Sequence, residues 1–242
     1  MPNVGMVASS CNVPLGPQWK ANIGVGFVAV AGTTLLINLT TPIAVDDMII
    51  VRVAADNLSA TTPTMTVSDP SGNTYSQVAF AGINATAAAG VVGGLFACTA
   101  TSAVAAGQNI TVTFSGSVAH KAGYAESFLK FSSTPRAGET PASGASSTPS
   151  VTSVSASTGD LVIGMAAVET RFVPSAYDSD TSNGSWSTGF VRQSATSGTD
   201  NLCVEAVGQW KIVTGAGTQT YNITAGASTD WVAHTAVFAP IP

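Results

Sequence analysis

The sequence predicts an all-β protein made of two tandem, duplicated β-sandwich domains, immunoglobulin-like or jelly-roll, with an extended N-terminal arm. Three observations support this fold class. Apolar and polar residues alternate with a period of two, Gly, Pro, Asn and Asp interrupt the chain at short intervals, and several short motifs recur at one spacing. Sustained helical periodicity is missing, so we expect strands throughout.

The alternation is clearest in two segments of the first half. Residues 35–40 place Leu, Ile and Leu on one face, and residues 110–115 place Ile, Val and Phe on one face. Between them, residues 65–67 lead into Asp69–Asn73, where Pro and Gly favour a tight turn. These segments predict half-buried antiparallel strands joined by turns.

Repeated motifs predict an internal duplication, which is the most informative feature of the chain. Two motif pairs are 113 residues apart and a third, which contains a histidine, is 114 apart. The pairs are Asp47–Val51 with Asp160–Gly164, Asn109–Thr111 with Asn222–Thr224, and Val118–Ala122 with Val232–Ala236. We therefore expect Met48–Val53 and Leu161–Ala166 to be equivalent strands of the two repeats.

The repeat spacing sets the expected boundaries. Residues 32–131 form the first sandwich and residues 150–242 the second. Residues 132–149 are rich in Ser, Thr, Pro, Gly and Ala, which is typical of a linker. Residues 1–31 match nothing in the second repeat and are expected to form an arm or an added edge strand.

The composition excludes several classes of partner. Charged residues make up only 9% of the chain and hydrophobic residues 45%. No apolar run approaches the roughly 18 residues of a membrane-spanning helix, so we expect no membrane insertion. The net charge of −5 and the scattered basic residues argue against nucleic acid. A surface of Ser, Thr, Asn and Gly instead favours contacts with other proteins, because little charge must be desolvated.

No cofactor or catalytic machinery is predicted. The chain has neither a Gly-x-Ser-x-Gly elbow at a strand-to-helix turn nor a glycine-rich phosphate loop before a helix. Cys11, Cys98 and Cys203 fit neither a disulfide framework nor a metal site and are expected to be small buried apolar residues. A secretory signal is not visible at the N-terminus. We expect no enzyme activity.

Two histidines and a group of acidic residues are the candidate ligands. His120 and His234 fall at apparently equivalent places in the repeats and could be bases or metal ligands, but inherited strand histidines explain them better. The segment 178–184 could bind calcium, yet it lacks the closing Glu of a calcium loop. We expect an ordinary polar loop there and no metal. Asp47 and Asp160 are expected to close turns before buried strands.

Aromatic residues supply the remaining candidates for binding. Trp186, Trp210, Trp231 and Tyr221 could stack on a sugar or pack inside the protein, and packing is the expected role. The candidate ligand or partner contacts are Trp186, Asp178 and Asp180 in the second repeat, and Trp19 and Phe27 in the arm.

Three of these patterns resemble a known group of proteins. They are the Asp-Leu-Val-Ile strand at residues 160–163, the turn Asp69–Tyr75, and the closing strand at residues 232–238. Together they resemble β-sandwich virion proteins of tailed bacteriophages that infect actinobacteria, described as minor tail or capsid-decorating components. The resemblance covers residues 32–240 and leaves residues 1–31 unmatched. It implies a non-catalytic structural component, located in the virion and contacting other virion proteins and copies of itself.

A carbohydrate-binding adhesin is the alternative function, with loops of the second sandwich holding a host cell-surface glycan. The arm supports the structural function, because residues 1–31 carry many apolar side chains that an extended segment could bury in a groove or on a sheet edge. We expect deletion of residues 2–22 to leave both sandwiches folded and to abolish incorporation into a particle.

Overall fold

The computed structural model describes residues 16–58, 61–86, 89–137, 141–170, 174–194 and 203–242, and their regular structure is entirely β-strand, as predicted. The strands are β1 Gln18–Val28, β2 Gly32–Leu39, β3 Met48–Asp56, β4 Met65–Ser68, β5 Ser76–Thr86, β6 Ala89–Thr99, β7 Asn109–Val118, β8 Lys121–Leu129, β9 Phe131–Ala137, β10 Ala142–Ser146, β11 Ser150–Ala156, β12 Leu161–Val168, β13 Phe190–Gln193, β14 Glu205–Ile212, β15 Gly217–Asn222 and β16 Thr229–Pro240.

The first body is an eight-stranded antiparallel sheet in the order β4-β7-β2-β1-β8-β3-β6-β5. The sheet curls into a nearly closed barrel around an apolar core. The alternation in β2 explains its two faces: Leu35 and Ile37 are buried in this core, whereas Leu36 and Asn38 point outward. The predicted half-buried strands are therefore confirmed for β2 and β7.

The second body has two sheets. The larger has the order β10-β16-β12-β14-β13, and β9 also pairs with β16. The smaller consists of β11 and β15. Val162, Val207 and Val237 from the larger sheet share a core with Val151 and Tyr221 from the smaller one. The second body is thus a pair of facing sheets.

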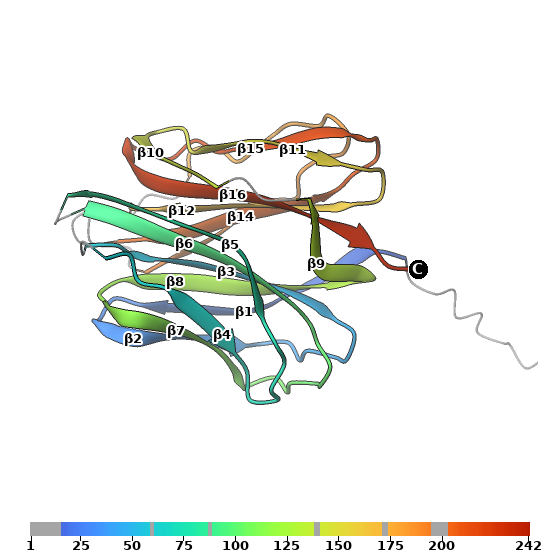
Figure 1. The fold of residues 1–242 in the computed structure, drawn as a ribbon, viewed down its shortest axis with the longest axis horizontal. Coiled ribbons are helices and arrows are strands. Elements are labelled where there is room, and N and C mark those ends of the chain that lie inside the picture. The colour runs from blue at the N-terminus through green and yellow to red at the C-terminus, as the bar shows by residue number, and fades with distance from the viewer. Residues whose placement is uncertain (1–15, 59–60, 87–88, 138–140, 171–173, 195–202) are drawn as a thin grey trace, which may run out of the picture.

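The two bodies pack against each other through a third apolar core, which makes the molecule a stack of β-layers (Figure 1). β3 and β12 are buried along their whole length because each has a sheet on both faces. In β3, Ile49 and Val51 face the first core, whereas Met48 and Ile50 face the second body. This double burial explains why both strands are continuous apolar runs without alternation.

The central strands occupy equivalent places in the two bodies, as the repeat predicts. β3 lies between β8 and β6, and β12 lies between β16 and β14. The turns before them also match. Asp47 accepts a hydrogen bond from the Ala44 N–H at 2.8 Å, and Asp160 accepts one from the Ser157 N–H at 2.7 Å. The residue before each aspartate has a positive φ, 69° and 90° respectively. The expected turn role of both aspartates is confirmed.

The N-terminal segment and the expected linker differ from the prediction. β1 lies in the interior of its sheet, paired with β8 along its length, and is not an edge strand. Residues 132–149 are not a simple connection, because they contain most of β9 and all of β10, and both strands pair with β16. Since β16 occupies the place of β8, β9 and β10 together are the counterpart of β1. The sequence does not predict strands here, because Pro135 in β9 and Gly144 in β10 are residue types that are rare inside strands.

The interior position of β1 changes where the arm can be cut. Deleting residues 2–22 would remove residues 18–22 of β1, including Trp19, together with their pairing to β8, so this deletion also cuts into the first body. Residues 1–15, about half of the predicted arm, lie outside the described residues. A truncation that respects the fold ends at residue 15.

Candidate partner-binding surface

An apolar hollow of about 510 Å³ lies between β1 and β2 on the surface of the first body. Its walls include Phe27, Val30 and Leu36, which are 53%, 71% and 46% exposed. These are among the most exposed large apolar side chains of the described residues. A group of exposed apolar side chains around one hollow is typical of a surface that another molecule covers.

The hollow follows from how β1 and β2 meet. The two strands pair at only two positions, Gly24 with Leu39 and Val25 with Asn38. A Cβ at Gly24 would lie 2.6 Å from the carbonyl oxygen of Asn38, so this close crossing requires glycine. Beyond the crossing, the outward faces of both strands line the hollow.

Basic side chains border the hollow. Arg192 of β13 places its guanidinium 4.0 Å from the centre of the Phe27 ring, a cation–π contact between the two bodies. Burial lowers the pKa of Arg192. Lys121 is fully buried and donates from Nζ to the carbonyl oxygens of Val30 at 3.0 Å and Gly32 at 3.2 Å, which fixes the β1–β2 turn. Lys121 therefore fixes the backbone of residues 30–32, which form part of the rim of the hollow.

Trp19 lies outside the hollow, at the other end of β1. Its ring stacks on Trp210 of the second body, with centroids 5.9 Å apart and planes 17° apart. Its Nε1 donates to Glu126 Oε1 at 3.2 Å. Of the two candidate contacts predicted in the arm, Phe27 thus lines the exposed hollow, whereas Trp19 joins the two bodies.

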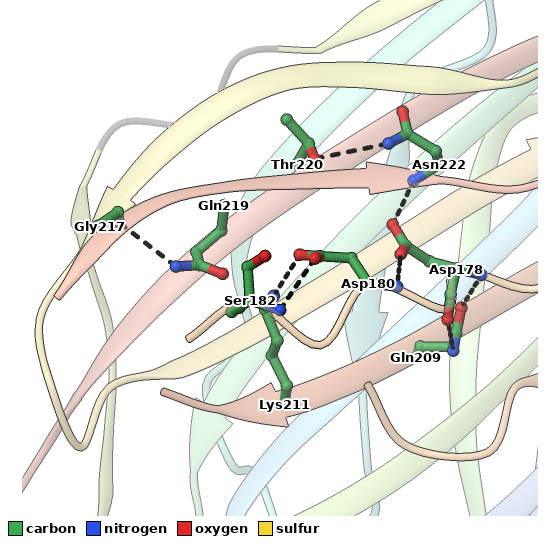
Figure 2. A network of polar contacts seen from close by, with 9 residues as sticks. All are labelled: Asp178, Asp180, Ser182, Gln209, Lys211, Gly217, Gln219, Thr220 and Asn222. Carbon is green, nitrogen blue, oxygen red and sulfur yellow. Dashed lines mark hydrogen bonds and ion pairs between the residues drawn. The ribbon is translucent and has the colours of Figure 1, made fainter. Parts of the chain in front are cut away.

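Asp178 serves the fold of the second body (Figure 2). The Asn222 N–H donates to its Oδ2 at 2.8 Å, and the Asp180 N–H donates to its Oδ1 at 2.8 Å. Its own N–H donates to Gln209 Oε1 at 2.8 Å. With the side chain buried and both oxygens occupied, Asp178 holds its loop against β14 and β15.

Asp180 is more accessible and also has partners within the loop. Its Oδ1 accepts the Ser182 N–H at 2.9 Å, and its Oδ2 accepts Lys211 Nζ at 3.4 Å (Figure 2). These bonds lower its pKa, chiefly through the Ser182 N–H. An open hollow of about 640 Å³ lies beside this loop, lined by Tyr177, Asp178 and Asp180 among others. The geometry is that of a polar loop, as expected.

Trp186 is only 8% exposed and belongs to the core of the second body. Its ring lies 5.2 Å from that of Tyr221, and Lys211 Nζ lies 4.7 Å from its centre. Trp231 and Tyr221 are also buried. The expected packing role of these rings is confirmed, and Trp210 packs at the junction with Trp19 and Phe128.

A buried ion pair of the first body, located at its junction with the second, was not predicted from the sequence. Arg52 is fully buried on the face of β3 that meets the second body. It bonds to Glu126 of β8, and its Nη2 donates to the carbonyl oxygen of Gln209 at 3.3 Å. Its position had a signal in the sequence: Arg52 is the one charged residue within the apolar run from Met48 to Ala55.

Carboxyl groups from both bodies gather at one end of their junction. Asp56 accepts the His120 N–H at 3.1 Å, and Glu169 accepts the Gly90 N–H at 3.0 Å. Burial raises the pKa of Asp56 to about 7. Burial, together with the nearby Asp230 and Asp56, raises the pKa of Glu169 to about 8. Both groups are therefore largely protonated at mildly acidic pH, which permits two acids to lie close together.

The two histidines are not equivalent, which corrects the third motif match. His234 pairs with Met165 in β12. The residue 113 positions before Met165 is Arg52, and its partner in β8 is Tyr124. His234 therefore corresponds to Tyr124, whereas His120 precedes β8. The Val-Ala-His similarity is a coincidence of sequence. The Asn-Ile-Thr pair is not equivalent either, because Asn109 begins β7 whereas Asn222 ends β15. The correspondence between the bodies therefore depends on strand order and on the matched turns of Asp47 and Asp160.

Cys98 and Cys203 are buried, as predicted, and Cys11 lies outside the described residues. Burial raises the pKa of Cys98 to about 11. Among the described residues no group of three His, Cys, Asp or Glu side chains is arranged to hold a metal ion. The same part of the chain contains no helix long and apolar enough to span a membrane. Comparisons with protein-family models, curated proteins and solved structures found no match.

Proposed function

We propose that this protein is a non-enzymatic structural component of a bacteriophage virion, either a minor tail protein or a capsid decoration protein. The observation that carries the proposal is the exposed apolar hollow of Phe27, Val30 and Leu36 on a charge-poor block whose two bodies share one buried core. A structural unit needs a rigid body and a surface that loses little hydration energy on contact. Both features are present, and the sequence resemblance supplies the virion context.

We also propose that the two bodies derive from one duplicated β unit, although the first is a single barrel-like sheet and not the sandwich predicted for residues 32–131. Support comes from the matched neighbours of β3 and β12, the matched turns of Asp47 and Asp160, and β9 and β10 in the place of β1. Duplication doubles the length of the block, and the faces of β3 and β12 that point away from their own cores pack against each other.

A carbohydrate-binding adhesin is less well supported by the side chains. Trp186, the candidate stacking platform, is buried, and Asp178 uses both carboxylate oxygens within the protein. Sugar binding generally needs an exposed aromatic ring beside free polar groups. Beside the loop of Asp180 the ring of Tyr177 is half-buried, and Asp178 and Asp180 are both bonded within the protein.

Analysis of purified phage particles tests the function. Particles banded on a density gradient should contain this chain at a fixed stoichiometry to the major capsid or tail protein, measured by quantitative mass spectrometry. Immunogold labelling should then distinguish head from tail. A chain that is expressed during infection but absent from washed particles would contradict the proposal.

A further inference from the structure

The N-terminal residues of the chain have the composition of a ligand for the hollow. Residues 1–15 contain no Asp, Glu, Lys or Arg, and they include Val4, Val7, Val13 and Leu15. A segment of this composition matches the apolar walls formed by Phe27, Val30 and Leu36 and needs no ion pair to bind there. We propose that residues 1–15 of one copy dock in the β1–β2 hollow of a second copy, so that copies join end to end.

The position of the arm favours a second copy over its own chain. Residue 16 lies beside the start of β1, next to the junction of Leu129 with Gln18. The lining of the hollow begins at Val25, seven residues further along β1 and about 23 Å away. To reach its own hollow the arm would have to reverse direction at residue 16 and run back beside β1 over that distance. A neighbour placed in line with the first copy presents its hollow directly to an arm that can extend up to about 50 Å.

Such a contact is heterologous, since the arm and the hollow are different surfaces. Repeating it gives a ring or a filament, depending on the rotation between copies. The inference deepens the proposed function, because rings and filaments of identical copies are the assemblies that a tail or capsid component forms. Burying apolar side chains of this size contributes about 1.5–3 kcal/mol each.

Disulfide cross-linking in trans tests the contact, because the arm contains the natural thiol of Cys11. One chain carries Leu36→Cys together with Cys11→Ser, which leaves a thiol in the hollow and none in the arm. It is mixed with the unaltered chain and oxidised mildly. We expect a species of twice the chain mass on a non-reducing gel, lost on reduction, with peptide mass spectrometry showing Cys11 joined to position 36. Both partners keep Cys98 and Cys203, which are buried.

The matched control moves the thiol to another exposed apolar position. Val45 is 52% exposed and does not line the hollow, so Val45→Cys with Cys11→Ser should cross-link at least tenfold less. Circular dichroism of each variant confirms that it is folded.

Two results would overturn the inference. Equal yields for Leu36→Cys and Val45→Cys would show that the hollow does not hold the arm. A Leu36→Cys chain with Cys11 retained that forms only an internal disulfide at monomer mass would show that the arm docks on its own chain. Because the experiment uses purified protein, absence of the chain from phage particles would contradict the virion proposal while leaving end-to-end docking standing.

Discussion

At the scale of single residues, the chain places its few charges where they have specific structural tasks. Arg52 pairs with Glu126 within the first body and bonds to the carbonyl oxygen of Gln209 in the second. Asp178 holds a loop, and Lys121 fixes the β1–β2 turn. The sequence predicted the turn aspartates, because an Asp before an apolar run has a local signature. It did not predict the partners of Arg52, because those lie 74 and 157 residues away and depend on how the bodies pack.

The Arg52 pair yields the first prediction. Arg52→Met should lower the free energy of unfolding by about 3 kcal/mol, because it leaves the nearly buried Glu126 carboxylate without its cation. Adding Glu126→Gln should recover part of that loss, since no unpaired charge remains. Urea denaturation of both variants measures the difference. Equal stability of the single and double variants would show that the charge of Glu126 is not the cause.

At the scale of elements, period-two alternation identified β2 and β7 correctly, and the repeat identified β3 and β12. β1, β9 and β10 were assigned to an arm and a linker because their glycines and prolines obscure the strand pattern. Gly24 is needed for a close crossing of strands, which no local sequence rule reports. The hollow was equally invisible in sequence, although Phe27 was identified as a candidate contact.

Two glycine substitutions test the crossing. Gly24→Ala should destabilise the protein by about 1–3 kcal/mol, because its Cβ would meet the backbone of Asn38 at 2.6 Å and neither strand can move easily. Gly116→Ala in β7 is the matched control, since no atom lies within 4 Å of its Cβ position, and it should be neutral or slightly stabilising. Thermal unfolding compares them. A Gly24→Ala protein as stable as the control would contradict the close crossing.

At the scale of the whole molecule, the junction between the bodies is as well buried as either core, so the chain is expected to unfold as one unit.

The carboxyl groups at one end of that junction make the stability of the protein sensitive to pH. Asp56 and Glu169 have pKa values of about 7 and 8 in the folded protein, above those of the free side chains. The folded state therefore retains protons that the unfolded chain releases between about pH 4 and pH 8.

The third prediction follows from this difference. The stabilisation is complete below about pH 4 and is lost as pH rises through 7 and 8, so the protein should be less stable at pH 8.5 than at pH 5.5, by on the order of a few kcal/mol. Denaturant unfolding across this range measures the slope. Asp56→Asn keeps an acceptor for the His120 N–H and should flatten the profile. Stability that is constant or rises with pH in the unaltered protein would contradict the assignment.

The protein is proposed to be a building block that assembles through its own arm and hollow. Sedimentation velocity of the purified chain, with and without residues 2–15, tests it most directly. We expect the weight-average mass of the full chain to rise with concentration through multiples of the monomer. The truncated chain, which keeps all of β1, should stay monomeric and folded. A full chain that remains monomeric at every concentration, or a truncated chain that associates equally well, would contradict it.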